Sequence, residues 1–167
     1  MSAADAAIAA RIRAELADLQ RVVKRVEGLT RKAVERDDAD YYDGVALNLH
    51  AFYVGVERVL QMIVREIDGA EPQGGEWHRE ILSQCAAAVT DTRPAVLHMP
   101  TRDALDEFRA FRHVVRNVYA FSLRPDRLRG LAAALPSCFA LLSADLGEFA
   151  EFLESIDTGP GAPASAD

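Results

Sequence analysis

The stretch IAARIRAELADLQRVVKRVEGL, Ile8 to Leu29, decides the fold class because its apolar residues recur at steps of three and four. This spacing places them on one face of an α-helix and the charged residues on the opposite face. The pattern predicts a long amphipathic helix over about residues 4–36. Its expected buried face consists of Ile8, Ile12, Leu16, Leu19, Val23, Val26 and Leu29.

The same periodicity resumes after the polar tract ERDDAD, residues 35–40, which offers acidic capping residues for a second helix. Two long helices joined by so short a turn are expected to pack antiparallel. The glycines and proline of DGAEPQGGE, residues 68–76, then end the second helix and begin a loop. The expected buried face of the second helix consists of Val45, Leu49, Phe52, Val56, Val59, Ile63 and Ile67.

Further helices are predicted from Trp77 to about Val89 and from Thr101, as the N-cap, to about Leu123. Asp103 and Asp106 would then occupy the first turn of the latter, at the positive end of the helix dipole. Pro125 interrupts the pattern, so two more helices are expected over residues 126–135 and 137–156. The chain is therefore predicted to be an all-α helical bundle of about five to six helices. One domain would cover residues 1–156, followed by a disordered tail over residues 157–167.

Composition narrows the compartment and the chemistry. The apolar runs are far shorter than the roughly 20 residues that cross a bilayer, and the N-terminus lacks the pattern of a signal peptide, so we expect no membrane association and a cytoplasmic location. Cys85 and Cys138 have no zinc-site spacing and are expected to be free and buried. The four histidines show no HExxH pattern and no phosphate-binding glycine loop is present, so we expect no metal and no cofactor.

Charge is unevenly distributed along the chain. The net charge is −7, which argues against a protein that coats nucleic acid over its whole surface. Residues 102–129 nevertheless carry seven arginines against four acids, a local charge of +3. An anionic ligand is therefore expected to be drawn to this segment.

The segment FRAFRHVVRNVYAF, Phe108 to Phe121, separates into two helical faces. Leu105, Phe108, Phe111, Val115 and Val118 form the expected buried stripe. The neighbouring face gathers Arg109, Arg112, His113, Arg116 and Tyr119. Guanidinium groups bind phosphate bidentately, so one interpretation is an anion site. The other is that these arginines pair with acids on other helices or form an oligomer contact.

Two further clusters are candidates for the same site. His50, Tyr53 and Glu57 on the second helix could line the cleft, although a structural role for His50 is an equal alternative. Trp77 and His78 follow the glycine-rich loop, where a packed indole and a histidine that caps the helix are the favoured interpretation.

The octapeptide RHVVRNVY, Arg112 to Tyr119, resembles the signature of the HepT-like branch of the HEPN superfamily: an arginine, a polar residue, three further positions, a histidine, any residue and a tyrosine. LHAFYVGVERVLQMI, Leu49 to Ile63, and GGEWHREIL, Gly74 to Leu82, support the resemblance, which extends over about residues 40–154.

The resemblance implies a helical homodimer that brings two signatures together in one cleft and acts as a metal-independent endoribonuclease toxin on RNA. It also implies a partner, an antitoxin nucleotidyltransferase of the MNT type, which silences the toxin by transferring AMP to Tyr119. Carried over by position, Arg112 stabilises the scissile phosphate and His113 occupies the polar position. Arg109 and Arg116, which share the basic face of the helix, are expected to bind RNA phosphates.

One position departs from the signature. Asn117 stands where the catalytic histidine is expected, and an amide cannot act as a general base for a 2′-hydroxyl. His113 is the nearest substitute along the sequence, but it points about 100° around the helix from Arg112. Two alternatives to the nuclease therefore stay open. One is a catalytically inactive HEPN module that binds RNA, a nucleotide or a nucleotidyltransferase, and the other is a purely structural helical dimer.

Overall fold

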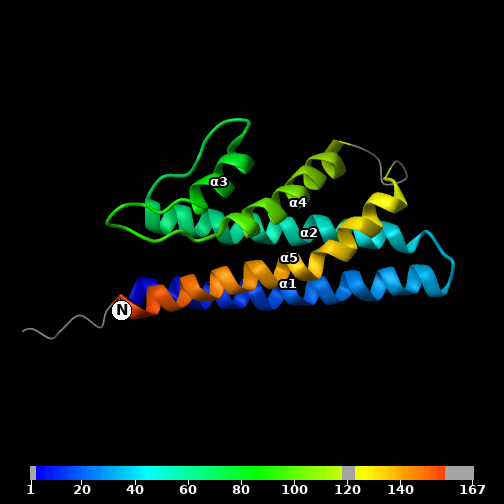
Figure 1. The fold of residues 1–167 in the computed structure, drawn as a ribbon, viewed down its shortest axis with the longest axis horizontal. Coiled ribbons are helices and arrows are strands. Elements are labelled where there is room, and N and C mark those ends of the chain that lie inside the picture. The colour runs from blue at the N-terminus through cyan, green and yellow to red at the C-terminus, as the bar shows by residue number, and fades with distance from the viewer. Residues whose placement is uncertain (1–2, 118–122, 157–167) are drawn as a thin grey trace, which may run out of the picture.

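The computed structural model describes residues 3–117 and 123–156, and the fold class is all-α, as predicted (Figure 1). Within this part of the chain, the only β-type pairing is an isolated bridge between Val89 and Arg93. The helices are α1 (Ala3–Glu35), α2 (Tyr41–Ile63), the π-helical turn η1 (Val64–Asp68), α3 (Trp77–Cys85), α4 (Met99–Asn117) and α5 (Pro125–Ser155).

Helices α1, α2 and α5 run along the long axis of the molecule, with α2 and α5 antiparallel to α1 (Figure 1). Helix α1 makes its most extensive contacts with these two helices. The periodic residues predicted for the α1 face are buried, apart from Leu16, which is partly buried. At Gly55, a Cβ atom would approach the Leu19 side chain to 2.8 Å, so glycine permits the close crossing of α1 and α2.

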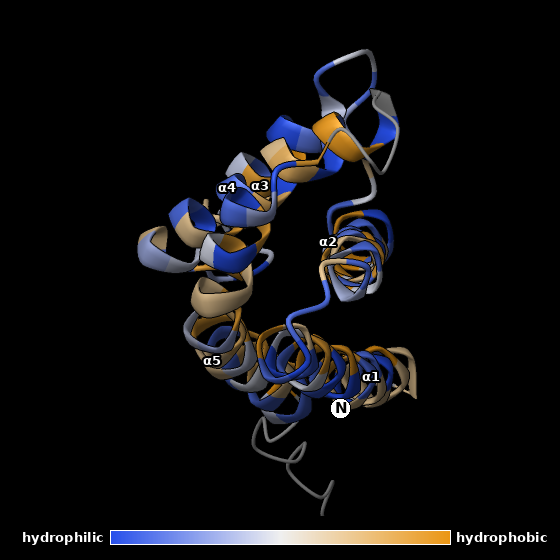
Figure 2. Cartoon of the chain, turned by 90° about the vertical axis from the view of Figure 1, so that its right-hand side faces the viewer, coloured by the Kyte–Doolittle hydropathy of each residue, from blue (hydrophilic) through white to orange (hydrophobic). Residues whose placement is uncertain are grey.

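Helices α3 and α4 lie on the part of the bundle formed by α2 and α5 (Figure 2). Helix α4 contacts α2, α3 and α5, whereas α3 contacts α2 and α4. Helices α3 and α4 therefore pack against each other and against α2, so a site between them is built from residues of α2, α3 and α4.

Helix α5 corrects the prediction of two helices over residues 126–135 and 137–156, because it continues through Pro136. A proline inside a helix removes one hydrogen bond and crowds the preceding turn. Leu131, Leu135, Cys138 and Leu142 are buried on both sides of it, so packing against the bundle outweighs that cost. Among the described residues, α5 is the one helix long and apolar enough to cross a membrane, yet eleven of its residues are buried in the bundle.

The start of α4 also differs from the prediction. The helix begins at Met99, and Thr101 lies inside the first turn, where it is buried, rather than acting as the N-cap. Pro100 fits the first turn because an amide N–H there has no partner within the helix. Asp103 and Asp106 consequently lie beyond the first turn. The predicted extension to Leu123 crosses residues 118–122, which lie outside the described part, as does the predicted disordered tail over residues 157–167.

Helix α3 ends at Cys85 instead of about Val89, because the chain that follows forms a loop held by a buried ion pair. Arg93 donates from Nε and Nη2 to the two carboxylate oxygens of Asp68 at 2.6 and 2.7 Å, and its side chain is fully buried. Asp68 ends the π-helical turn, and Gly69 follows it in the left-handed region at φ 71°.

Cys85 and Cys138 are both free and buried, as predicted.

Candidate functional site

Helix α4 presents two faces, as the sequence predicts over the described residues. Leu105, Phe108 and Phe111 are buried, and Val115 is partly buried against the core. Val118, the last residue of the predicted stripe, lies outside the described part. With this stripe packed inward, the polar face of α4 meets α3 around a pocket of about 280 Å³, here called the arginine pocket. It is lined by Gly75, Glu76, His78, Arg79, Arg109, Arg112, His113 and Arg116.

The Arg112 side chain contacts a buried carboxylate on another helix. Its Nε lies 2.9 Å from Glu57 Oε2, and its Nη1 lies 3.2 Å from His78 Nε2. The Arg112 side chain is 16% exposed and that of Glu57 is 5% exposed. The alternative that the arginines pair with acids on other helices is thus realised for Arg112, while its guanidinium still lines the pocket.

Glu57 is a buried carboxyl group surrounded by cations. Burial raises its pKa to about 7, an effect that Arg112, Arg116 and Arg109 oppose. Its Oε1 lies 2.6 Å from His78 Nδ1. This contact and the one with Arg112 Nε are short, although neither is aligned as a hydrogen bond. Glu57 therefore connects α2 to both α3 and α4.

The role predicted for His78 as a helix cap is wrong, because Glu76 occupies the N-cap position of α3. His78 instead lies between Glu57 and Arg112, and its ring centroid lies 3.6 Å from that of the partly buried Trp77. Burial and the positive charges of Arg112, Arg116 and Arg109 lower the pKa of His78 to about 4. The ring is therefore neutral near pH 7, in contact with a carboxyl group on one side and a guanidinium on the other.

The remaining arginines of the pocket differ in their partners. Arg109 donates from Nε to Asp106 Oδ1 at 2.6 Å, and this bond lowers the pKa of Asp106. Arg116 and Arg79 are exposed. Four arginines thus face one glutamate, Glu76, around the opening, which favours an anionic ligand.

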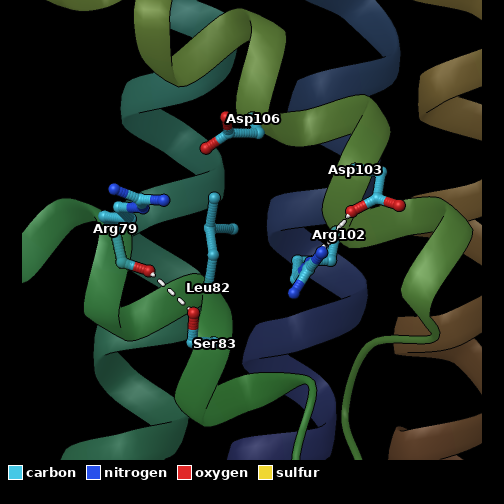
Figure 3. A pocket seen from close by; sticks show the side chains of 6 residues that line it. All are labelled: Arg79, Leu82, Ser83, Arg102, Asp103 and Asp106. Atoms are coloured by element: carbon cyan, nitrogen blue, oxygen red, sulfur yellow. Dashed lines mark hydrogen bonds and ion pairs between the residues drawn. The ribbon is translucent and has the colours of Figure 1, made fainter.

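Arg79 also lines a second pocket of about 340 Å³ beside the first (Figure 3). Its walls come from α3 and α4, and Arg102 there donates to Asp103 at 2.6 Å. The two pockets share Arg79, so a ligand that fills the arginine pocket can extend along the groove between α3 and α4.

Two α2 residues predicted as candidates for the site lie behind the pocket. Tyr53 is fully buried and its hydroxyl has no hydrogen-bond partner among the described residues. Burial raises its pKa, so the phenol stays protonated. His50 is partly buried, and burial together with Arg112 and Arg116 lowers its pKa. Neither residue is among those that line the arginine pocket.

The structure brings together Arg109, Arg112, His113 and Arg116, four of the six residues predicted for the site. Asn117 is the last residue of α4, and Tyr119 lies outside the described residues. Within residues 3–117 and 123–156, no group of three or more histidine, cysteine, aspartate or glutamate side chains is arranged to hold a metal ion.

The sequence interpretation did not identify Arg79 as a site residue or the contact of His78 with Arg112. His78 and Arg79 follow Trp77 on the short helix α3, and no periodic pattern links that helix to α4. One signal for the site was present, namely a glutamate on the apolar face of α2, since an acid among Phe52, Val56 and Val59 requires a buried partner.

The fold and the pocket define a class: an all-helical bundle with a cationic pocket on a late helix that carries the arginine-containing signature. Comparison with known families makes this specific. A family model described as "HepT-like protein" matches residues 44–153, and the chain belongs to this HepT-like family. No curated protein and no solved structure matches the chain.

Proposed function

We propose that the chain is the endoribonuclease toxin of a HEPN/MNT toxin–antitoxin module and binds the phosphodiester of RNA in the arginine pocket. The observation that carries this proposal is the convergence of Arg79, Arg109, Arg112 and Arg116 on one pocket in a member of the HepT-like family. Arginines placed around a phosphate stabilise the charge that develops on its oxygens during cleavage, and they do so without a metal ion.

Arg112 is the arginine best placed to act on the scissile phosphate. Its Nε lies 2.9 Å from Glu57 Oε2, which orients the side chain, and Arg112 is one of the residues that line the pocket. Such pre-organisation reduces the entropy lost when a ligand binds. Arg109, oriented by Asp106, and the exposed Arg116 would bind flanking phosphates.

The proposal includes a homodimeric assembly and regulation by a partner enzyme. The chain would act as a homodimer in the cytoplasm, paired with an MNT-type nucleotidyltransferase that transfers AMP to Tyr119. Tyr119 follows the last residue of α4 by two positions in the chain. Mass spectrometry after co-expression with a neighbouring nucleotidyltransferase is expected to find AMP on the wild type and none on Tyr119→Phe. An unmodified wild-type chain would argue against this regulation.

A second candidate function is an RNA-binding HEPN module without nuclease activity. Asn117 favours it, because the histidine of the signature is absent at that position. This candidate predicts that RNA binds in the arginine pocket but stays intact, and that Asn117→His leaves the result unchanged.

Cleavage of labelled single-stranded RNA in the presence of a chelator distinguishes these functions. The wild type is expected to cleave, and Arg112→Ala to lose both most of the activity and part of the RNA affinity. Arg129→Ala is the matched control, since Arg129 pairs with Asp126 on the exposed start of α5. Cleavage that survives in Arg112→Ala would exclude the proposed site, and RNA binding without cleavage would favour the second candidate.

A further inference from the structure

His78 belongs to a chain of three side chains from three helices. Glu57 on α2 faces His78 Nδ1 at 2.6 Å, and Arg112 on α4 faces His78 Nε2 at 3.2 Å. The Glu57 side chain is 5% exposed and the His78 side chain 19% exposed, so the buried end of the chain is the carboxyl group and the accessible end is the ring. No pattern in the signature itself accounts for this arrangement.

The contacts define the tautomer of the ring. A guanidinium has only hydrogen-bond donors, so His78 Nε2 must accept from Arg112 Nη1. A neutral imidazole then carries its proton on Nδ1, the atom that faces Glu57. Nε2 therefore holds a lone pair on the side of the ring that faces Arg112.

Building on the proposed function, we propose that His78 is the catalytic base of this chain and takes over the task of the histidine that Asn117 replaces. When the planar guanidinium of Arg112 turns toward a bound phosphate, Nη1 leaves His78 Nε2, while Glu57 stays beside Nδ1 of the ring. This rotation uncovers Nε2 beside the phosphate. Glu57 acts as a positioning residue, since it orients the ring without touching RNA.

The step is a transesterification. His78 Nε2 accepts the proton of the ribose 2′-hydroxyl while the 2′-oxygen forms a bond to phosphorus. The bond between phosphorus and the 5′-oxygen of the next nucleotide breaks, and that oxygen takes a proton from solvent water. The products are a 2′,3′-cyclic phosphate and a free 5′-hydroxyl, and the imidazolium returns its proton to solvent.

The charges around His78 adjust its basicity to the bound state. In the empty pocket, burial and nearby cations hold the pKa of His78 at about 4, so the ring is free to accept a proton but is a weak base. A phosphate dianion or diester offsets those cations and raises the pKa of the ring. The groups that face His78 are Glu57 on α2, Arg109, Arg112, His113 and Arg116 on α4, and Glu76 and Arg79 on its own helix.

The variant His78→Gln tests the proposal, because glutamine keeps a hydrogen-bonding side chain beside Glu57 but does not titrate. On a single-stranded RNA of mixed sequence, its kcat is expected to fall about 100-fold or more while KM changes little. His98→Gln is the matched control, because His98 contacts Asp145 on α5 and is not among the residues that line the arginine pocket, and it is expected to retain activity. In the double variant His78→Gln, Asn117→His, the histidine of the signature is expected to restore part of the rate.

A second measurement needs no variant. The ring of His78 is followed by NMR in the wild-type chain while a single-stranded RNA with a 2′-O-methyl group on each ribose is added, because this RNA has no free 2′-hydroxyl and cannot be cleaved by the proposed step. The Nδ1–H tautomer is expected, with a pKa that rises from about 4 toward the ordinary histidine value of about 6.5. A proton on Nε2, or a pKa that does not change on binding, would overturn the proposal.

Failure of this inference and failure of the proposed function give different results. Wild-type cleavage that persists within about threefold in His78→Gln overturns the role of His78 alone. A wild-type chain that binds RNA and leaves it intact overturns both the nuclease function and the catalytic base.

Discussion

Glu57 Oε2 lies 2.9 Å from Arg112 Nε, and this contact joins the buried face of α2 to an arginine of the pocket whose Nη1 also contacts the His78 ring. A buried carboxyl group requires a cationic partner, and a cation beside a pocket requires a fixed orientation. The pair satisfies both requirements. It also means that the stability of the bundle and the geometry of the pocket depend on the same two side chains.

Glu57→Gln is expected to lower the stability of the bundle and to disturb the geometry of the arginine pocket. The substitution leaves the guanidinium of Arg112 partly buried without its carboxylate, so the free energy of unfolding is expected to fall by about 1–3 kcal/mol. Misplacement of Arg112 is expected to lower RNA cleavage by about tenfold to a hundredfold. Urea unfolding and the RNA cleavage assay measure the two effects.

Glu154→Gln is the control for this prediction. Glu154 pairs with Arg13 at 2.7 Å, but both side chains are more than 40% exposed. Its loss is expected to cost at most about 1 kcal/mol and no activity. Equal effects of the two substitutions would contradict a special role for Glu57.

The stability of the wild type is expected to depend weakly on pH between about 4.5 and 6.5. Burial raises the pKa of Glu57 from its ordinary value near 4.5 to about 7, so the folded chain binds an extra proton and this contribution to stability is lost as the pH rises. The pKa of His78 falls from about 6.5 to about 4, so its contribution is lost as the pH falls. The two slopes have opposite signs.

Single substitutions should reveal the pH dependence of the free energy of unfolding that Glu57 and His78 each contribute. In His78→Gln, the free energy of unfolding is expected to decrease as the pH rises from 4.5 to 7, because the contribution of Glu57 remains. In Glu57→Gln it is expected to increase as the pH rises from 4 to 6.5, because that of His78 remains. Urea unfolding at several pH values measures both, and parallel profiles for the three proteins would contradict the opposing shifts.

Much of the fold follows from residue spacing. The steps of three and four on α1 and α4 predict which residues are buried, because one face of a helix must pack against a neighbour. Local breaker rules were less reliable. Pro136 predicts an interruption, but α5 continues because its buried residues on both sides are held against the bundle. Tertiary packing there outweighs the local preference.

The sequence predicts the arginines that one helix carries and names Glu57 as a candidate on α2, but it does not predict how α3 completes the site. Arg109, Arg112 and Arg116 share a face of α4, and helical spacing alone reveals this. The contact of Arg112 with His78 joins residues 34 positions apart, and it depends on how α3 packs against α4. Since α3 is short and follows a loop, no periodicity in the sequence fixes that packing.

Arg93→Ala is expected to be strongly destabilising. Arg93 is fully buried, donates twice to Asp68 and also donates to the carbonyl oxygens of Ala87, Pro94 and Gln84. Its removal leaves the carboxylate of Asp68 and three carbonyl groups without this partner, so a loss of about 3–5 kcal/mol is expected in urea unfolding. Arg13→Ala removes an exposed pair instead and should cost less than about 1 kcal/mol. A similarly small loss for Arg93→Ala would show that the loop does not depend on this pair.

RNA affinity should depend on salt through the arginine pocket. For single-stranded RNA, each phosphate contact contributes about 0.7 to the slope of log K against log salt concentration. Arg109→Ala and Arg116→Ala are therefore each expected to reduce the magnitude of the slope by about that amount. Fluorescence anisotropy at several salt concentrations measures it, with Arg129→Ala as a control that leaves the slope unchanged. Unchanged slopes in both pocket variants would place the RNA elsewhere.

Asp145 on α5 fixes the start of α4, and its loss should be felt there. Asp145 is buried, and it accepts from the backbone N–H of His98 at 2.7 Å and contacts the ring Nδ1 at 2.8 Å. Asp145→Ala is expected to lower the free energy of unfolding by about 1–3 kcal/mol, because an N–H at the beginning of the helix loses its acceptor. Glu148→Ala, at an exposed position one turn away, should change it by less than about 0.5 kcal/mol.

The cost of Asp145→Ala should also depend on pH. The hydrogen bond that the His98 ring donates to the Asp145 carboxylate raises the pKa of His98, so the folded state binds this proton more tightly than the unfolded state. That part of the stability is fully present below the ordinary histidine pKa of about 6.5 and is lost as the pH rises through the pKa of the folded state. The substitution should therefore cost more at acidic than at alkaline pH, as urea unfolding near pH 5.5 and pH 8.5 can measure. An equal cost at both values would mean that the backbone contact of Asp145, and not its contact with the ring, supplies all of the stabilisation.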